Sequence, residues 1–91
     1  MPLTSSRRSE LRAQAHKLDP VVIIGDKGLT AEVVAEVDRA LKAHELIKVR
    51  APGLEREERE AALNTLCQRT GAQAVQSIGK VFVIYRKRDE T

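Results

Sequence analysis

Hydrophobic positions in the first quarter of the chain change from helical spacing to an unbroken apolar run. Leu11, Ala15 and Leu18 recur at intervals of four and three residues, which predicts a helix from Ser6 to Lys17 capped by Ser5 or Ser6. The following run, Val21–Ile24, consists of four β-branched residues. Such a run is typical of a strand covered on both faces, as in a parallel sheet.

The next apolar pattern is again helical and is followed by strict alternation. A second helix is predicted from Thr30, a good N-cap, to about His44. Its apolar stripe comprises Val33, Val34, Val37, Ala40 and Leu41. Residues Leu46–Arg50 alternate apolar and basic side chains, which predicts a half-buried strand that displays Lys48 and Arg50.

The last third of the chain contains one more helix and two short strands. A helix is predicted from Glu55 to Arg69, with Gly71 as its left-handed stop. Strands are predicted over Gln73–Ser77 and Val81–Tyr85. The Gly79-Lys80 turn between them predicts a hairpin and therefore antiparallel pairing.

The predicted order is α-β-α-β-α-β-β, which indicates one α/β (α+β) domain built on a four-stranded mixed sheet with helices. The strand–helix–strand unit makes the first two strands parallel. The chain has 91 residues, of which 42% are hydrophobic, enough for a single modest core. We therefore expect one domain over residues 1–91, with its core at about 6–88.

The charged residues are unevenly distributed. Residues 1–17 carry four bases and one acid, residues 80–88 carry four bases and no acid, and the predicted third helix begins with several glutamates. Separated basic and acidic regions favour an oriented polyanionic partner, although solvated chain ends would give the same pattern. Aromatic residues make up only 2%, which argues against base recognition by a broad stacking platform.

The segment Gly25-Asp26-Lys27-Gly28 joins a predicted strand to the start of a predicted helix. Glycines allow close backbone approach and a helix N-terminus offers free N–H groups, so phosphate contact is chemically sensible. An ordinary tight turn that needs Gly28 at positive φ explains the segment equally well. The residues after Gly28 do not match a P-loop, and no dinucleotide fingerprint is present.

Other candidate sites are weak. His16, His44 and Cys67 do not form a metal-ligand spacing, so no metal or other cofactor is expected. Cys67 lies on the apolar stripe of the third helix and is expected to be a small buried hydrophobe. No set of residues suggests an enzyme. The chain shows no secretory signal or membrane-spanning apolar run, so we expect a cytoplasmic protein.

Three segments together resemble the CRM domain, in the small stand-alone bacterial form known as YhbY-like proteins. They are LRAQAHKLDPVVIIGDKGLT, ALKAHELIKV and RTGAQAVQSIGKVFVIYR. The resemblance implies a fold similar to the C-terminal domain of bacterial translation initiation factor three. It also implies RNA binding, association with precursors of the large ribosomal subunit, and a role in ribosome assembly.

With this resemblance, we expect contacts mainly to RNA phosphates, because few aromatic residues are available. The residues expected to form the RNA-binding surface are Arg7, Arg8, Arg12, Lys17, Gly25, Asp26, Lys27, Gly28, Lys48, Arg50, Lys80, Arg86, Lys87 and Arg88. We expect a monomer without a small-molecule substrate. The alternative is a protein-interaction module that docks on a ribosomal protein or maturation factor through its acidic third helix.

Overall fold

The helices and strands follow the predicted order in a computed structural model, which describes residues 3–87. The elements are α1 (Ser5–Ala15), β1 (Pro20–Ile23), α2 (Ala31–His44), β2 (Leu46–Arg50), α3 (Arg56–Thr70), β3 (Gln73–Ile78) and β4 (Val81–Tyr85). Three helices and one four-stranded sheet within the described residues confirm the predicted fold class.

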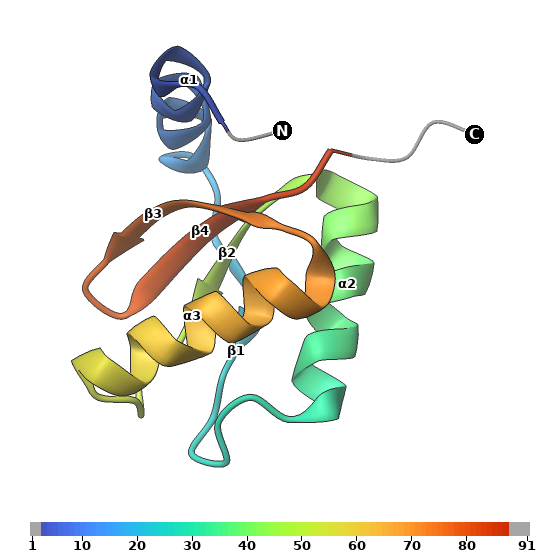
Figure 1. Cartoon of the computed structure of the whole chain (residues 1–91), viewed down its shortest axis with the longest axis vertical. Coiled ribbons are helices and arrows are strands. Elements are labelled where there is room, and N and C mark those ends of the chain that lie inside the picture. The colour runs from blue at the N-terminus through green and yellow to red at the C-terminus, as the bar shows by residue number, and fades with distance from the viewer. Residues whose placement is uncertain (1–2, 88–91) are drawn as a thin grey trace.

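The sheet is mixed, with the strand order β1-β2-β4-β3 (Figure 1). β1 runs parallel to β2, and β4 is antiparallel to both β2 and β3. The parallel pair and the hairpin are therefore both confirmed. Gly79 adopts a positive φ of 55° in the turn of the hairpin, a conformation that glycine takes without steric cost.

The larger hydrophobic core lies between one face of the sheet and the helices α2 and α3. Val37 and Leu41 of α2 and Leu66 of α3 pack with Ile47 and Phe82 of the sheet, and all five side chains are buried. Burial of apolar surface of this kind is the main favourable contribution to folding. These contacts position the two helices on a common face of the sheet.

Helix α1 packs on the opposite face of the sheet through a second, smaller cluster. Leu11 and Ala15 pack with Leu46, Val75 and Val83, and on β2 and β4 these residues alternate with residues of the larger core. Figure 1 shows α1 over the end of the sheet where β4 finishes, away from the loop between β1 and α2. The other half of this face is left without a helix.

The prediction that Val21–Ile24 is covered on both faces is wrong. Val22 and Ile24 are buried, but Val21 is 51% exposed and Ile23 is 59% exposed. The reason is that β1 is an edge strand and α1 packs on the other strands. An unbroken apolar run therefore does not mean complete burial here.

The helix ends agree closely with the sequence except in α1, which ends at Ala15, two residues before the predicted Lys17, and has a different N-cap. Thr4, not Ser5 or Ser6, caps α1 by accepting a hydrogen bond from the backbone N–H of Arg7. Thr30 caps α2 as predicted. Helix α3 begins with a capping box and ends at Gly71, which has a positive φ of 73° and is the predicted left-handed stop.

Cys67 is half-buried and packs against the larger core from α3. Its environment is therefore less enclosed than the sequence predicted. Burial still raises the pKa of its thiol above the ordinary value. This lowers the fraction of reactive thiolate at neutral pH.

Candidate nucleic-acid interface

The arginine side chains of helix α1 differ in their contacts and in their exposure to solvent. Arg7 forms an ion pair with Glu10 at 3.1 Å, and its guanidinium lies 5.4 Å from the centre of the Tyr85 ring. Hydrogen bonding to Tyr85, and then to Glu10, raises the pKa of Arg7. Arg8 is half-buried, with its Nε atom shielded from solvent. Arg12 is exposed and donates only to the hydroxyl of Ser9 among the contacts of the described residues.

The half of the sheet that α1 leaves uncovered carries apolar and basic side chains together. Across this face, Ile23 of β1 pairs with Arg50 of β2, Arg50 with Val81 of β4, and Val81 with Ile78 of β3. Lys48 lies two residues before Arg50 on the same strand, so it shares this face. We call this surface, formed by Ile23, Lys48, Arg50, Val81 and Ile78, the open sheet face.

A groove of about 430 Å³ lies where the C-terminal end of α1 overhangs this face. Arg12 and His16 form its helical side, and Lys48, Gln76 and Val83 are among the sheet residues that line it. The sequence placed Arg12 and Lys48 in the RNA-binding surface separately. The structure brings them to one groove.

The Gly25–Gly28 loop follows β1 and leads into α2. Gly28 has the predicted positive φ, 74°, and its N–H donates to the carbonyl of Gly25 at 2.9 Å to close the turn. Lys27 is exposed. Asp26 instead lies against the next loop, because a Cβ atom added to Gly53 would be only 2.6 Å from the Asp26 carboxylate. The Asp26 carboxylate therefore occupies the space that a side chain at position 53 would need.

Three turns meet at this end of the sheet. The Ile24 N–H donates to the Arg50 carbonyl at 2.7 Å, and the Ala51 N–H donates to the Lys80 carbonyl at the same distance. The loop that carries Lys27 and the turn that carries Lys80 are consequently tied to the end of β2. Three basic residues from separate sequence segments therefore lie at this end of the sheet: Lys27, Arg50 and Lys80.

The basic stretch at residues 80–88 does not form one patch. Lys80 lies before β4, whereas Arg86 and Lys87 follow it at the opposite end of the sheet. Arg88 lies outside the described residues. Lys87 is exposed, and Lys17, also exposed, lies just beyond α1. A strand of five residues is long enough to separate the charges that the sequence places together.

Arg86 differs from the other predicted contacts because its guanidinium is committed within the fold. It donates to the Asp38 carboxylate at 2.7 Å, to the Thr70 carbonyl at 2.6 Å and to the Asp38 carbonyl at 3.1 Å. These bonds join the end of β4 to α2 and α3. Arg86 therefore stabilises the fold, and its predicted place on the RNA-binding surface is not supported.

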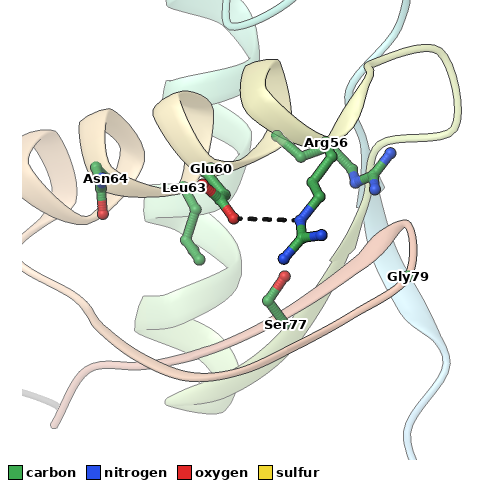
Figure 2. A pocket seen from close by; sticks show the side chains of 7 residues that line it. Arg56, Glu60, Leu63, Asn64, Ser77 and Gly79 are labelled. Carbon is green, nitrogen blue, oxygen red and sulfur yellow. Dashed lines mark ion pairs between the residues drawn. The ribbon is translucent and has the colours of Figure 1, made fainter.

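A second hollow, of about 550 Å³, lies between α3 and the β3–β4 hairpin. Figure 2 shows Arg56, Glu60 and Ser77 around it, with the ion pair between Arg56 and Glu60 at 3.6 Å. Arg59, which also lines this hollow, donates a hydrogen bond to the Leu54 carbonyl at 2.7 Å. Because Arg56 and Arg59 already have partners within the fold, this hollow is a weaker site for an anion than the open sheet face.

The described residues, 3–87, contain neither a cluster suited to a metal ion nor a helix suited to a membrane span. No group of three or more His, Cys, Asp or Glu side chains is arranged to hold a metal ion there. None of their helices combines the length and the apolar character needed to cross a membrane.

Comparison with known proteins identifies the family. The sequence profile of the CRS1 / YhbY (CRM) domain matches residues 3–86. The chain belongs to the CRM domain family. This confirms the resemblance carried by the three quoted segments, and it covers α1 through β4.

Individual CRM relatives agree with this assignment. A protein of Pseudomonas aeruginosa named as a probable RNA-binding protein is 45% identical over 87 residues, covering 96% of this chain and 84% of the relative. A protein of Haemophilus influenzae named as an RNA-binding protein is 42% identical over 88 residues, covering 97% and 89%. Both alignments span nearly the whole CRM domain.

The solution structure of a hypothetical protein of Staphylococcus aureus, described as a candidate RNA-binding protein, has the same fold. Its TM-score is 0.85 at 34% identity, and the alignment covers 98% of this chain and 93% of that chain. The helices and strands described here therefore have counterparts in a solved structure.

Proposed function

We propose that this CRM domain binds RNA, specifically ribosomal RNA in precursors of the large ribosomal subunit, and assists ribosome assembly. It would do so as a monomer in the cytoplasm and without catalysis. The names of its relatives support RNA as the ligand. The ribosomal target comes from the resemblance to YhbY-like proteins.

The observation that carries the proposal is a series of basic residues that begins at α1, crosses the open sheet face and ends at the loops beyond β2. Arg12 lies at the helix, Lys48 and Arg50 follow on β2, and Lys27 and Lys80 continue at the far end of the strands. Such a stripe follows a phosphate backbone. Phosphate contacts fix position and orientation, whereas sequence preference requires additional contacts.

Salt dependence of RNA affinity tests this surface. We expect log K to fall with log salt at a slope of roughly −3 to −4, as four to six phosphate contacts at about 0.7 each would give for single-stranded or mixed RNA. The double variant Arg12→Gln/Arg50→Gln should flatten the slope by about 1.4. The control Arg39→Gln/Arg69→Gln removes the same charge from exposed positions on α2 and α3.

The titration uses a structured fragment of large-subunit ribosomal RNA at several salt concentrations. A flattened slope for the first double variant and an unchanged slope for the control support the proposed surface. Equal slopes for all three proteins would show that Arg12 and Arg50 do not contact phosphate. Absence of measurable affinity in the wild type would refute RNA binding itself.

Crosslinking in cells, followed by sequencing of the RNA adducts, tests the ribosomal target. We expect adducts in large-subunit ribosomal RNA and co-sedimentation of the protein with subunit precursors. Adducts confined to messenger or transfer RNA would exclude the assembly role while leaving RNA binding intact.

The acidic helix gives less support to the alternative, a protein-interaction module. Glu55 and Glu58 form the capping box of α3, and Glu60 pairs with Arg56. These carboxylates have structural partners that account for their positions. Retention of the Arg12→Gln/Arg50→Gln variant on subunit precursors at the wild-type level would nevertheless favour the protein-docking alternative.

A further inference from the structure

Exposed apolar side chains gather on the half of the sheet that no helix covers. Ile23 and Ile78 are each 59% exposed, and neighbouring Val21 is 51% exposed. Ile23 and Ile78 lie at the two ends of one row across four strands, with Arg50 and Val81 between them. Large exposed apolar side chains gathered on one face of a protein often mark a binding surface.

Basic residues lie among the apolar residues of the open sheet face as well as beside them. Arg50 separates Ile23 from Val81 in the same row, and Lys48 lies about 7 Å away along β2. Arg12 reaches the adjoining groove from α1. Asp19 is the acidic residue among the described residues that line the groove. The surface therefore combines aliphatic positions with a net positive charge.

We propose that the open sheet face binds the bases of an unpaired RNA segment, with Lys48 and Arg50 on its phosphates. This inference rests on the proposed function and specifies the form of RNA that is recognised. Each unpaired nucleotide offers a flat, largely apolar base beside an anionic phosphate, which matches aliphatic side chains interleaved with cations. Single-stranded loops are the RNA elements whose bases can be splayed out in this way.

Other occupants match these residues less well. A paired duplex presents phosphates but keeps its base faces stacked, so it would leave Ile23 and Ile78 without a partner. A protein would have to desolvate Lys48 and Arg50 within an apolar interface and supply a carboxylate for each, which is costly. The interleaved charge therefore favours RNA over a protein.

The groove beneath α1 provides a polar contact for one base. Gln76 lies opposite Val83 on the hairpin and is among the groove residues. Its amide both donates and accepts hydrogen bonds, as the edge of a base does. The groove volume of about 430 Å³ leaves room for a single nucleotide. Base contact at this position adds a preference that phosphate contacts alone cannot give.

A matched pair of double variants separates base contact from charge. Ile23→Thr/Ile78→Thr makes both positions polar, whereas Ile23→Val/Ile78→Val keeps them apolar, and threonine and valine have nearly the same shape and both suit a strand. Affinities are measured for two RNAs of equal length: a hairpin with an unpaired loop, and a blunt duplex. We expect the threonine pair to bind the hairpin about tenfold more weakly than the valine pair, and the duplex equally.

Each outcome has a distinct meaning. A selective loss for the hairpin, with an unchanged salt slope, supports base contact at the open sheet face. Equal hairpin affinity for the threonine and valine pairs overturns it and leaves the patch to a protein partner, while the proposed RNA function stands. An equal loss for hairpin and duplex also overturns base contact. Failure of the wild type to bind either RNA refutes the proposed function as well.

Discussion

The guanidinium of Arg86 donates a 2.7 Å hydrogen bond to the carboxylate of Asp38, 48 residues earlier in the chain. The Arg86 side chain is only 20% exposed, and it also donates to the carbonyls of Thr70 and Asp38. One side chain thus connects β4 with both helices of the larger core. A charge-assisted network of this kind is stronger than neutral hydrogen bonds.

Arg86→Ala should lower the free energy of unfolding by about 2 kcal/mol, because it leaves the carbonyl of Thr70 without this donor and leaves the carboxylate of Asp38 with Lys42 alone as its cationic partner. Urea denaturation measures the change. The control is Lys87→Ala, the next residue, which is exposed and should have little effect. A loss of RNA affinity in folded Arg86→Ala, without a loss of stability, would restore Arg86 to the RNA-binding surface.

The Arg86–Asp38 contact also makes stability depend on pH. Hydrogen bonding to Arg86, and then to Lys42, holds the pKa of Asp38 below its ordinary value of 3.8. A lowered folded-state pKa contributes stability above the unfolded value and loses it as pH falls through the folded value. The wild type should therefore exceed Asp38→Asn in stability at pH 7, with the difference shrinking below about pH 4. A difference that stays constant down to pH 2 would contradict this.

Gly28→Val should lower the free energy of unfolding by about 1–3 kcal/mol, because a β-branched residue is strained at a φ of 74°. Its Cβ would meet nothing within 4 Å, so the loss comes from backbone conformation and not from a clash. Thermal or urea unfolding tests it. Gly25→Val is the control, since Gly25 also has free space and its φ is not in the left-handed region.

Lys27→Ala should weaken RNA binding without changing stability, because Lys27 is an exposed cation at the tip of the Gly25–Gly28 loop. We expect the salt slope to flatten by about 0.7, the value for one phosphate contact. Lys42→Ala removes an exposed charge from α2 and provides the comparison. Identical affinities for wild type and Lys27→Ala would assign the loop a purely structural role.

Cys67→Ser should lower the free energy of unfolding by about 1 kcal/mol, because a hydroxyl is placed where the half-buried thiol packs against the core. Burial raises the pKa of the Cys67 thiol, so a thiol reagent should label the native protein more slowly than the urea-unfolded protein at pH 8. Equal labelling rates would indicate that the thiol is freely accessible.

Local sequence patterns were sufficient to predict the helices and strands and most of the residues at which they begin and end. The alternation in Leu46–Arg50 fixed which residues of β2 face the core, and the positions of Gly28 and Gly71 required positive φ. Both signals depend on residues close together in sequence. The strand pairing followed from the βαβ connection and the short hairpin turn.

Properties that depend on distant residues were not predictable in the same way. The run Val21–Ile24 has no polar residue to mark an exposed face, and only the position of α1 over other strands shows that β1 is half uncovered. The role of Arg86 depends on Asp38, which no local spacing connects to it. The open sheet face likewise requires the register of four strands.

The close approach of Asp26 to Gly53 couples the side chains that two loops can carry at these positions. A side chain at position 53 would occupy the space of the Asp26 carboxylate, 2.6 Å from the added Cβ atom. A lineage that replaces Gly53 must therefore rotate or shorten the side chain at position 26. Across relatives, the identities of these two positions should covary, although they lie 27 residues apart in the sequence.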